Sequence, residues 1–215
     1  MVATRRLRWL VALLAVSLAP PRDARASPTR WSADLGRSQI VVHVYKKGLL
    51  SGMAHDHHFG VGNFRATATL DETPPSRARF EVIIAADSLR DGQPDLSPED
   101  RAKVDGQSAG AGVLDAHRFP EIRFAPEEPA DAVLSVKPDG SIEGSLAGTL
   151  SLHGQQHPLA VPVQAKREGE GWRVRGSVRF KQSDFGIEPY SGFLGTVAVH
   201  DEIQVEYDLV LEPTR

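Results

Sequence analysis

The chain contains no cysteine, and after its first 26 residues it has no long apolar run. The missing cysteine excludes disulfide bonds, zinc–thiolate centres, cysteine nucleophiles and a lipid-modified N-terminal cysteine. A helix that crosses a bilayer needs about 20 apolar residues, so no integral membrane span is expected beyond residue 26. A mature chain of this length is long enough to fold around its own apolar core.

The first 26 residues predict a cleaved secretory signal peptide. Arg5 and Arg6 give it a positive start, residues 9–19 form a short apolar run, and Ala24–Ala26 has the small-x-small pattern of a cleavage site. We therefore expect a periplasmic or secreted protein, exported by either the Sec or the Tat route.

Cleavage leaves two further parts. Residues 27–30 are expected to form a loose leader, and residues 31–215 to form one domain without internal repeats. Removing residues 1–26 lowers Lys+Arg from 25 to 20 and Asp+Glu from 28 to 27, so the net charge moves from −3 to −7. An acidic domain argues against nucleic acid as a partner and against adhesion to anionic lipid surfaces. It does not exclude a lipid held internally.

Apolar and polar residues alternate with a period of two along most of the mature chain, which predicts half-buried antiparallel strands. Asp139-Gly140, His153-Gly154 and Gly169-Glu170-Gly171 supply tight turns between them. Short connections and a polar exterior on every strand favour an all-β fold, a single antiparallel β-barrel. The predicted strands are Ile40–Tyr45, Phe64–Leu70, Phe80–Ala86, Leu134–Lys137, Ile142–Leu152, Leu159–Ala165, Trp172–Phe180 and Ile203–Leu211.

Residues 88–118 interrupt the alternation and predict a short helical insertion. Ser97 is a suitable N-cap for a helix that begins at Pro98, and residues 109–116 predict a second short helix. An insertion of this length between strands is often a lid over a cavity mouth. A docking element for a partner protein is the alternative.

Four segments, in this order, resemble the YceI-like family of bacterial secreted proteins. They read LDAHRFPEIRF at 114–124, LAGTLSLHGQQHPL at 146–159, FKQSDFGI at 180–187 and VHDEIQV at 199–205. The resemblance covers essentially residues 31–212. It implies an extended lipocalin-like barrel that binds a long isoprenoid lipid, a polyprenyl phosphate or a quinone-like molecule, in its central pore. It also implies a binding protein rather than an enzyme, with no cofactor besides the lipid. A homodimer is left open.

The inward-facing residues of the predicted strands are the expected ligand-binding residues, and a solid core is the alternative from alternation alone. The expected lining is Val42, Val44, Phe64, Phe80, Val82, Ile84, Phe124, Leu146, Leu150, Val161, Val163, Val174, Val178, Phe185, Val205 and Tyr207.

A histidine-rich loop offers a second function. His55, His57 and His58 surround Asp56, and imidazoles this close in sequence are candidate ligands of a divalent metal, with His43 or His200 as an additional ligand. A metal-binding protein or a metal-dependent hydrolase is therefore the alternative. A hydrogen-bonded polar mouth of the barrel is the interpretation we favour.

Ser183-Asp184-Phe185-Gly186 lacks the strand–turn–helix context of a catalytic serine. The segment predicts a turn instead, in which Ser183 and Asp184 cap backbone groups. Phe185 is expected to plug the barrel end and Gly186 to take a positive φ. No catalytic residue is expected.

Overall fold

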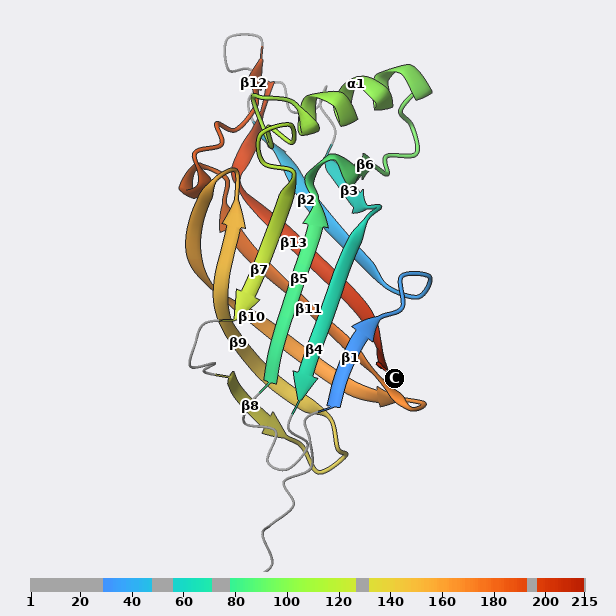
Figure 1. The fold of residues 1–215 in the computed structure, drawn as a ribbon. Coiled ribbons are helices and arrows are strands. Elements are labelled where there is room, and N and C mark those ends of the chain that lie inside the picture. Colours follow the sequence, from blue (N-terminus) through green and yellow to red (C-terminus); the bar gives the residue numbers. More distant parts are fainter. Residues whose placement is uncertain (1–28, 48–55, 71–77, 127–131, 193–196, 215) are drawn as a thin grey trace, which may run out of the picture.

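The computed structural model describes residues 29–47, 56–70, 78–126, 132–192 and 197–214 (Figure 1). Most of these residues lie in β-strands, which form one antiparallel sheet, and one segment forms an α-helix. The strands are β1 (Thr29–Ala33), β2 (Gln39–Lys47), β3 (His57–Val61), β4 (Phe64–Leu70), β5 (Ala78–Ala85), β6 (Leu89–Asp91), β7 (Glu121–Pro126), β8 (Ala132–Val136), β9 (Ile142–Leu152), β10 (Gln155–Glu168), β11 (Gly171–Lys181), β12 (Ser191–Gly192) and β13 (Val197–Pro213).

Eight of these strands close into a barrel. Their order is β1–β4–β5–β7–β9–β10–β11–β13, and β1 pairs back with β13 to complete the ring. Burial alternates along the strands, as in β9, where buried residues recur at every second position from Leu146 to Leu152 and the residues between them are partly exposed. The predicted fold class, a single antiparallel barrel with a short helical insertion, is confirmed.

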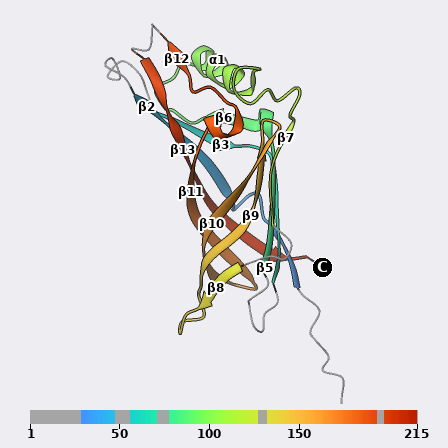
Figure 2. The same ribbon diagram turned by 90° about the vertical axis from the view of Figure 1, so that its left-hand side faces the viewer.

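The last strand holds the two halves of the sheet together. β13 pairs with β11 along one side, while its other side pairs first with β2 and then, from Leu211 to Pro213, with β1. β2 continues the sheet through β3 to β6. We call the end of the barrel near β8 and the start of β1 the β8 end. The opposite end, near β3, β6 and the helix α1, is the α1 end (Figures 1 and 2).

Turn residues occur where their backbone preferences predict them. His153 and Gly154 both have positive φ values, 50° and 76°, and join β9 to β10, as expected for a two-residue hairpin turn. Gly140 and Gly169 also have positive φ values, 79° and 62°. The three tight connections predicted from sequence are confirmed.

The insertion contains α1 (Pro98–Ala109), which both ribbon views place across the end of the barrel next to β6. The Ser97 hydroxyl accepts from the Asp100 amide, as its N-cap role predicts. The second predicted helix is wrong, because residues 110–116 form successive turns. Gly110 leaves the helical region with ψ 170° and Asp115 has φ 43°, so the helical ladder cannot continue.

Thr29 and Arg30 do not belong to a loose leader. They begin β1 and pair with Leu70 and Thr69 of β4. The sequence around Thr29 and Arg30 does not alternate. Pairing with β4, and not a local sequence pattern, places these residues in the sheet. The predicted signal peptide lies outside the described residues.

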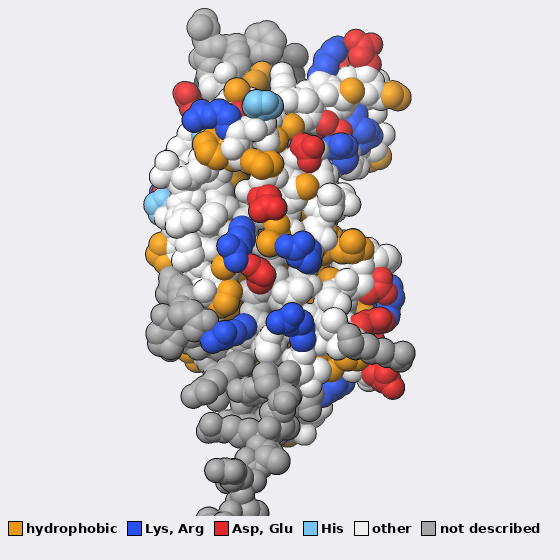
Figure 3. All heavy atoms as spheres, viewed as in Figure 1, with side chains coloured by type: hydrophobic (Ala, Val, Ile, Leu, Met, Phe, Trp, Pro, Cys, Tyr) orange, Lys and Arg blue, Asp and Glu red, His pale blue; other side chains and the backbone are white. Residues whose placement is uncertain are grey.

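The described surface is mixed in character. On the face shown in Figure 3, acidic and basic side chains are interspersed with small hydrophobic groups. Within the described part of the chain, no helix is long and apolar enough to cross a membrane.

Candidate ligand-binding cavity

An apolar cavity of about 140 Å³ lies inside the barrel. Its lining side chains are hydrocarbon except for Tyr207. Apolar cavities of about this size stay dry and take up small apolar guests. Ten of the residues expected from alternation line it: Val42, Phe80, Val82, Ile84, Phe124, Leu150, Val161, Val178, Val205 and Tyr207.

The insertion and its flanking short strands complete this cavity. Val61 of β3, Leu89 of β6 and Leu114, which follows α1, all contribute to the lining. The alternation missed them because β3 and β6 are short and Leu114 lies in a turn. In the sequence, Leu114 is an apolar residue within a non-periodic insertion, at the start of the segment 114–124 that resembles the YceI-like family.

A second cavity of about 70 Å³ lies at the β8 end of the barrel. Three further predicted residues, Leu146, Val163 and Val174, line it together with Trp31 and Trp172. Phe80 lines both cavities and therefore lies between them.

The remaining predicted lining residues belong to neither cavity. Phe64 is buried in the core, and Val44 is partly buried opposite His57. Phe185 is 2% exposed and packs edge-on against Phe180 at 5.4 Å between ring centroids. These three side chains fill the core around the cavities.

Tyr207 is the polar residue of the larger cavity, and its hydroxyl is satisfied within the fold. It lies opposite Gly176 of β11, where a Cβ would collide with the tyrosine hydroxyl. The missing side chain lets the ring cross the glycine, and the hydroxyl donates to the Pro162 carbonyl oxygen. Burial raises the pKa of Tyr207.

Trp31 and Trp172 present the opposite situation. Both are nearly buried, at 3% and 7% exposure, and neither indole N–H has a hydrogen-bond partner. The Arg167 guanidinium lies over both rings, 4.3 Å from the Trp172 centroid and 5.5 Å from that of Trp31. Trp31 is a residue whose role sequence reasoning missed.

At the α1 end, His57 turns toward the inside of the sheet. Its Nδ1 contacts the carboxylate of Asp91, whose side chain is fully buried. The same carboxylate accepts from the Gln93 amide at 2.8 Å. The Asp91 backbone amide donates to the Asp105 carboxylate, so the pair is tied to α1. Hydrogen bonds on both oxygens let a carboxylate stay buried.

His58 points to the opposite, outer face of β3. Its Nδ1 lies 2.7 Å from the Nδ1 of His43 on β2, so one ring donates and the other accepts. The Nε2 of His43 lies 3.4 Å from a carboxylate oxygen of Glu206.

The three histidines of the predicted metal site are thus not brought together among the described residues. His57 and His58 lie on opposite faces of β3, and His55 lies outside the described residues. Among the residues that the structure describes, no group of three His, Asp or Glu side chains is arranged to hold a metal ion. Metal binding stays a prediction.

The Ser183–Gly186 segment forms a short 3₁₀ turn that is fastened to β13. Gly186 has φ 69°, as predicted. The amide and hydroxyl of Ser183 both donate to the Asp201 carboxylate, at 2.8 and 2.6 Å. These bonds lower the pKa of Asp201. Asp201 lies where the pairing of β13 with β2 shifts register. The bonds from Ser183 therefore hold β13 at this irregular position in the barrel wall.

Comparison with known proteins identifies relatives along almost the whole chain. The family model described as YceI-like domain matches residues 31–211. A UPF0312 protein of Shewanella putrefaciens is 27% identical over 212 residues, which cover 96% of this chain and 97% of that protein.

Solved structures share the fold. BcnA of Burkholderia cenocepacia matches with a TM-score of 0.63 at 20% identity, covering 83% of this chain and 98% of BcnA. A polyisoprenoid binding domain from Saccharophagus degradans, implicated in plant cell wall breakdown, matches with a TM-score of 0.60 at 12% identity, covering 86% and 98%. At these identities the matches establish a common barrel fold.

Proposed function

Since this chain belongs to the YceI-like family, we propose that it is a non-catalytic binding protein that holds an isoprenoid lipid inside its barrel. The observation that carries the proposal is the apolar interior, with one cavity of about 140 Å³ and a second of about 70 Å³ along the same barrel. The Saccharophagus relative, described as a polyisoprenoid binding domain, supports the lipid class.

The energetics favour a chain-like apolar guest. Each buried CH₂ group contributes about 0.8 kcal/mol, so several prenyl units bind tightly without a charged anchor. The larger cavity alone is about the size that accepts a small ring. A longer chain requires the two cavities to join, and Phe80, which lines both, is the side chain that must move.

We place the entrance at the α1 end. Within α1 only Ser108 is buried, and Val104 is partly buried against the core, so the helix itself contributes little apolar surface to the barrel end. Lifting α1 alone exposes the Val104 side chain and little other apolar surface, so it should cost less free energy than separating strands of the barrel wall. The signal peptide predicted from residues 1–26 supports action in the periplasm or outside the cell.

Organic extraction of natively purified protein, followed by mass spectrometry, tests the proposal. We expect a stoichiometric prenyl lipid, and the extracted protein should bind an added long-chain prenol. Absence of lipid from the extract, together with failure to bind the prenol, would overturn the proposal.

A pair of variants on one strand controls for the site. Val82 lines the larger cavity, whereas Ile83, its neighbour on β5, faces outward beside Arg123. Val82→Phe fills the cavity and should abolish prenol binding, while Ile83→Phe should retain it. Circular dichroism establishes that both variants are folded.

A further inference from the structure

The barrel wall is incompletely paired between two of its strands. Residues 164–168 of β10 pair with residues 171–175 of β11, near the β8 end. From there to the α1 end, residues 155–163 of β10 pair with β9 alone, and residues 176–181 of β11 pair with β13 alone. Figure 2 shows the two strands diverging toward the α1 end. We call this stretch, all of which the structure describes, the β10–β11 gap.

Side chains, and not backbone hydrogen bonds, span the β10–β11 gap. Where the ladder stops, the Tyr207 hydroxyl of β13 donates to the Pro162 carbonyl oxygen of β10. Nearer the α1 end, the Phe185 ring contacts both strands. Its centroid lies 5.0 Å from that of His157 on β10 and 5.4 Å from that of Phe180 on β11. Moving these side chains separates no paired strands, so it costs less free energy than opening an intact ladder.

The larger cavity reaches the β10–β11 gap. Within β11, Trp172 and Val174 face inward where the ladder is intact, and each is 7% exposed. Val178 and Phe180 face inward beside the gap, line the larger cavity and are partly exposed. Burial of the inner face therefore falls where the pairing ends, and the gap brings the cavity lining to the surface.

Tyr207 separates this cavity from a groove of about 450 Å³ on the outside of the wall. The groove is lined by Pro162 and by the outward-facing Gln164 and Ser177, and also by Gly176. Tyr207 lines both spaces, and its hydroxyl occupies the position that a side chain at Gly176 would take. The tyrosine is therefore the partition between the apolar interior and a polar exterior.

We propose that the β10–β11 gap is a lateral opening through which an isoprenoid chain enters the cavity, and that Tyr207 is its gate. This inference rests on the proposed function, because it gives the route of the same ligand. The gap extends to the α1 end, so a prenyl chain slides in sideways along the wall without displacing α1. Its polar head group stays in the outer groove and avoids the cost of crossing an apolar interior.

Uptake kinetics test the gate. The probe is all-trans-retinol, an isoprenoid alcohol whose fluorescence reports binding, and excess geranylgeraniol displaces it to measure dissociation. Tyr207→Phe removes the bond to Pro162 and keeps the ring, so association and dissociation should both accelerate about fivefold, as expected when a closed state loses one hydrogen bond. Loss of a ligand contact alone accelerates dissociation only. Tyr45→Phe, which removes a bond to Gln204 on the outer face, should change neither rate.

A cross-link tests the opening without altering the gate. The protein has no cysteine, so a flexible bismaleimide joins only introduced thiols. Ala160→Cys combined with Arg179→Cys places thiols at exposed positions of β10 and β11, on either side of the gap. Ala160→Cys combined with Ala147→Cys is the matched control, because these residues already pair across β9 and β10. Cross-linking should abolish retinol uptake in the first variant and leave it unchanged in the control.

The outcomes separate the opening from the proposed function. Uptake that survives the cross-link between β10 and β11 overturns the lateral opening and leaves lipid binding intact. Acceleration by Ser97→Ala, which removes the cap of α1, without acceleration by Tyr207→Phe also overturns it and puts the entrance beneath the helix. Failure of both retinol and geranylgeraniol to bind the unmodified protein overturns the proposed function and the opening with it.

Discussion

The two ends of this barrel are closed in different ways. At the β8 end, β1 pairs with both β4 and β13, and Trp31 and Trp172 fill the interior beneath Arg167. At the α1 end, closure depends on an inserted helix and on the buried pair His57–Asp91. The β8 end is closed by strands of the barrel ring, whereas the α1 end is closed by the short strands β3 and β6 outside the ring and by the helix that packs on β6. This difference is why we propose the α1 end as the entrance for a guest.

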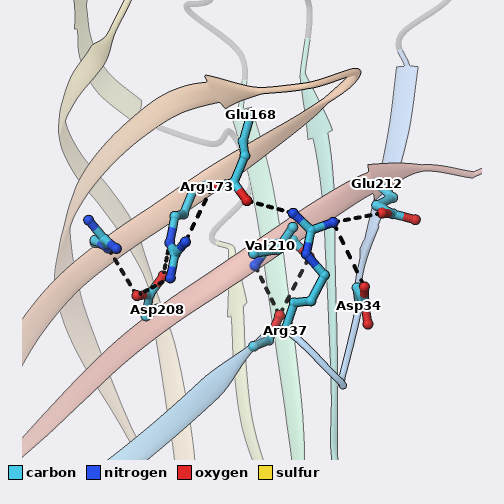
Figure 4. Close-up of polar contacts among 9 residues, drawn as sticks. Asp34, Arg37, Glu168, Arg173, Asp208, Val210 and Glu212 are labelled. Carbon is cyan, nitrogen blue, oxygen red and sulfur yellow. Dashed lines mark hydrogen bonds and ion pairs between the residues drawn. The ribbon is translucent and has the colours of Figure 1, made fainter.

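Ion pairs on the outer surface reinforce the β8 end (Figure 4). Arg37, in the turn after β1, reaches Glu168 of β10 at 2.5 Å and Glu212 of β13 at 3.1 Å. Arg173 of β11 bonds to Asp208 of β13 at 2.7 Å. The network connects β10 and β13, which do not pair with each other, through Arg37 in the turn after β1. It also adds an ion pair between the paired strands β11 and β13. Arg37 and Glu212 are exposed, and the other groups are partly exposed, which limits each pair to a small contribution.

The largest effect should come from the residue between the two cavities. Phe80→Ala should lower the free energy of unfolding by about 3 kcal/mol, because it removes a buried ring and leaves a void. It should also join the cavities and raise the affinity for long prenols relative to short ones. Urea denaturation and prenol titration measure both effects. Phe64→Ala, which alters the core but neither cavity lining, should lose stability without the gain in affinity.

A smaller effect, confined to the α1 end, is expected from Asp91→Asn. The change weakens the contact with His57 and keeps an oxygen for the Gln93 amide, so the expected loss is about 2 kcal/mol. Hydrogen exchange should accelerate in β3, β6 and α1 before it does so in β1. Equal acceleration at the two ends would contradict the contrast between them.

Removing the helix cap should loosen α1 alone. Ser97→Ala takes away the acceptor for the Asp100 amide and should destabilise α1 by about 1 kcal/mol. Faster amide exchange within α1, with an unchanged urea midpoint for the barrel, is the expected result. A parallel fall in the urea midpoint would show that α1 is an integral part of the barrel.

The smallest effect concerns the ion pairs of the β8 end. Hydrogen bonding from Arg173 lowers the pKa of Asp208 from its ordinary value of 3.8. A lowered pKa stabilises the folded state above pH 3.8, and this contribution is lost as the pH falls through the folded-state pKa. Asp208→Asn should therefore cost about 0.5 kcal/mol at pH 7. It should also flatten the stability profile below pH 4, as urea denaturation at a series of pH values would show. An unchanged acid limb would mean that the pair contributes nothing.

The barrel and its turns follow from local signals. Alternation in β9, β10, β11 and β13 identifies the strands, because side chains of successive residues point to opposite faces. His153-Gly154 and Asp139-Gly140 identify hairpins, because few residues tolerate a positive φ. Ser97 before Pro98 identifies the start of α1. Each of these signals depends on a few neighbouring residues and can therefore be recognised in the sequence.

Which side chains meet across the barrel cannot be predicted from such local signals. The alternation indicates that Trp172 faces inward, but only the closure of β1 onto β13 brings Trp31 into the same cavity. Likewise, the histidine cluster reads as one group, yet the pleat of β3 sends His57 to Asp91 and His58 to His43.

By itself, the sequence determined the period of each strand, the position of each tight turn and the start of the helix, because backbone and solvent preferences act locally. Only the tertiary structure decided where the barrel closes, which inward side chains leave space between them, and which buried donors lack an acceptor. Those properties depend on how side chains distant in sequence fill a shared volume. No single segment contains that information.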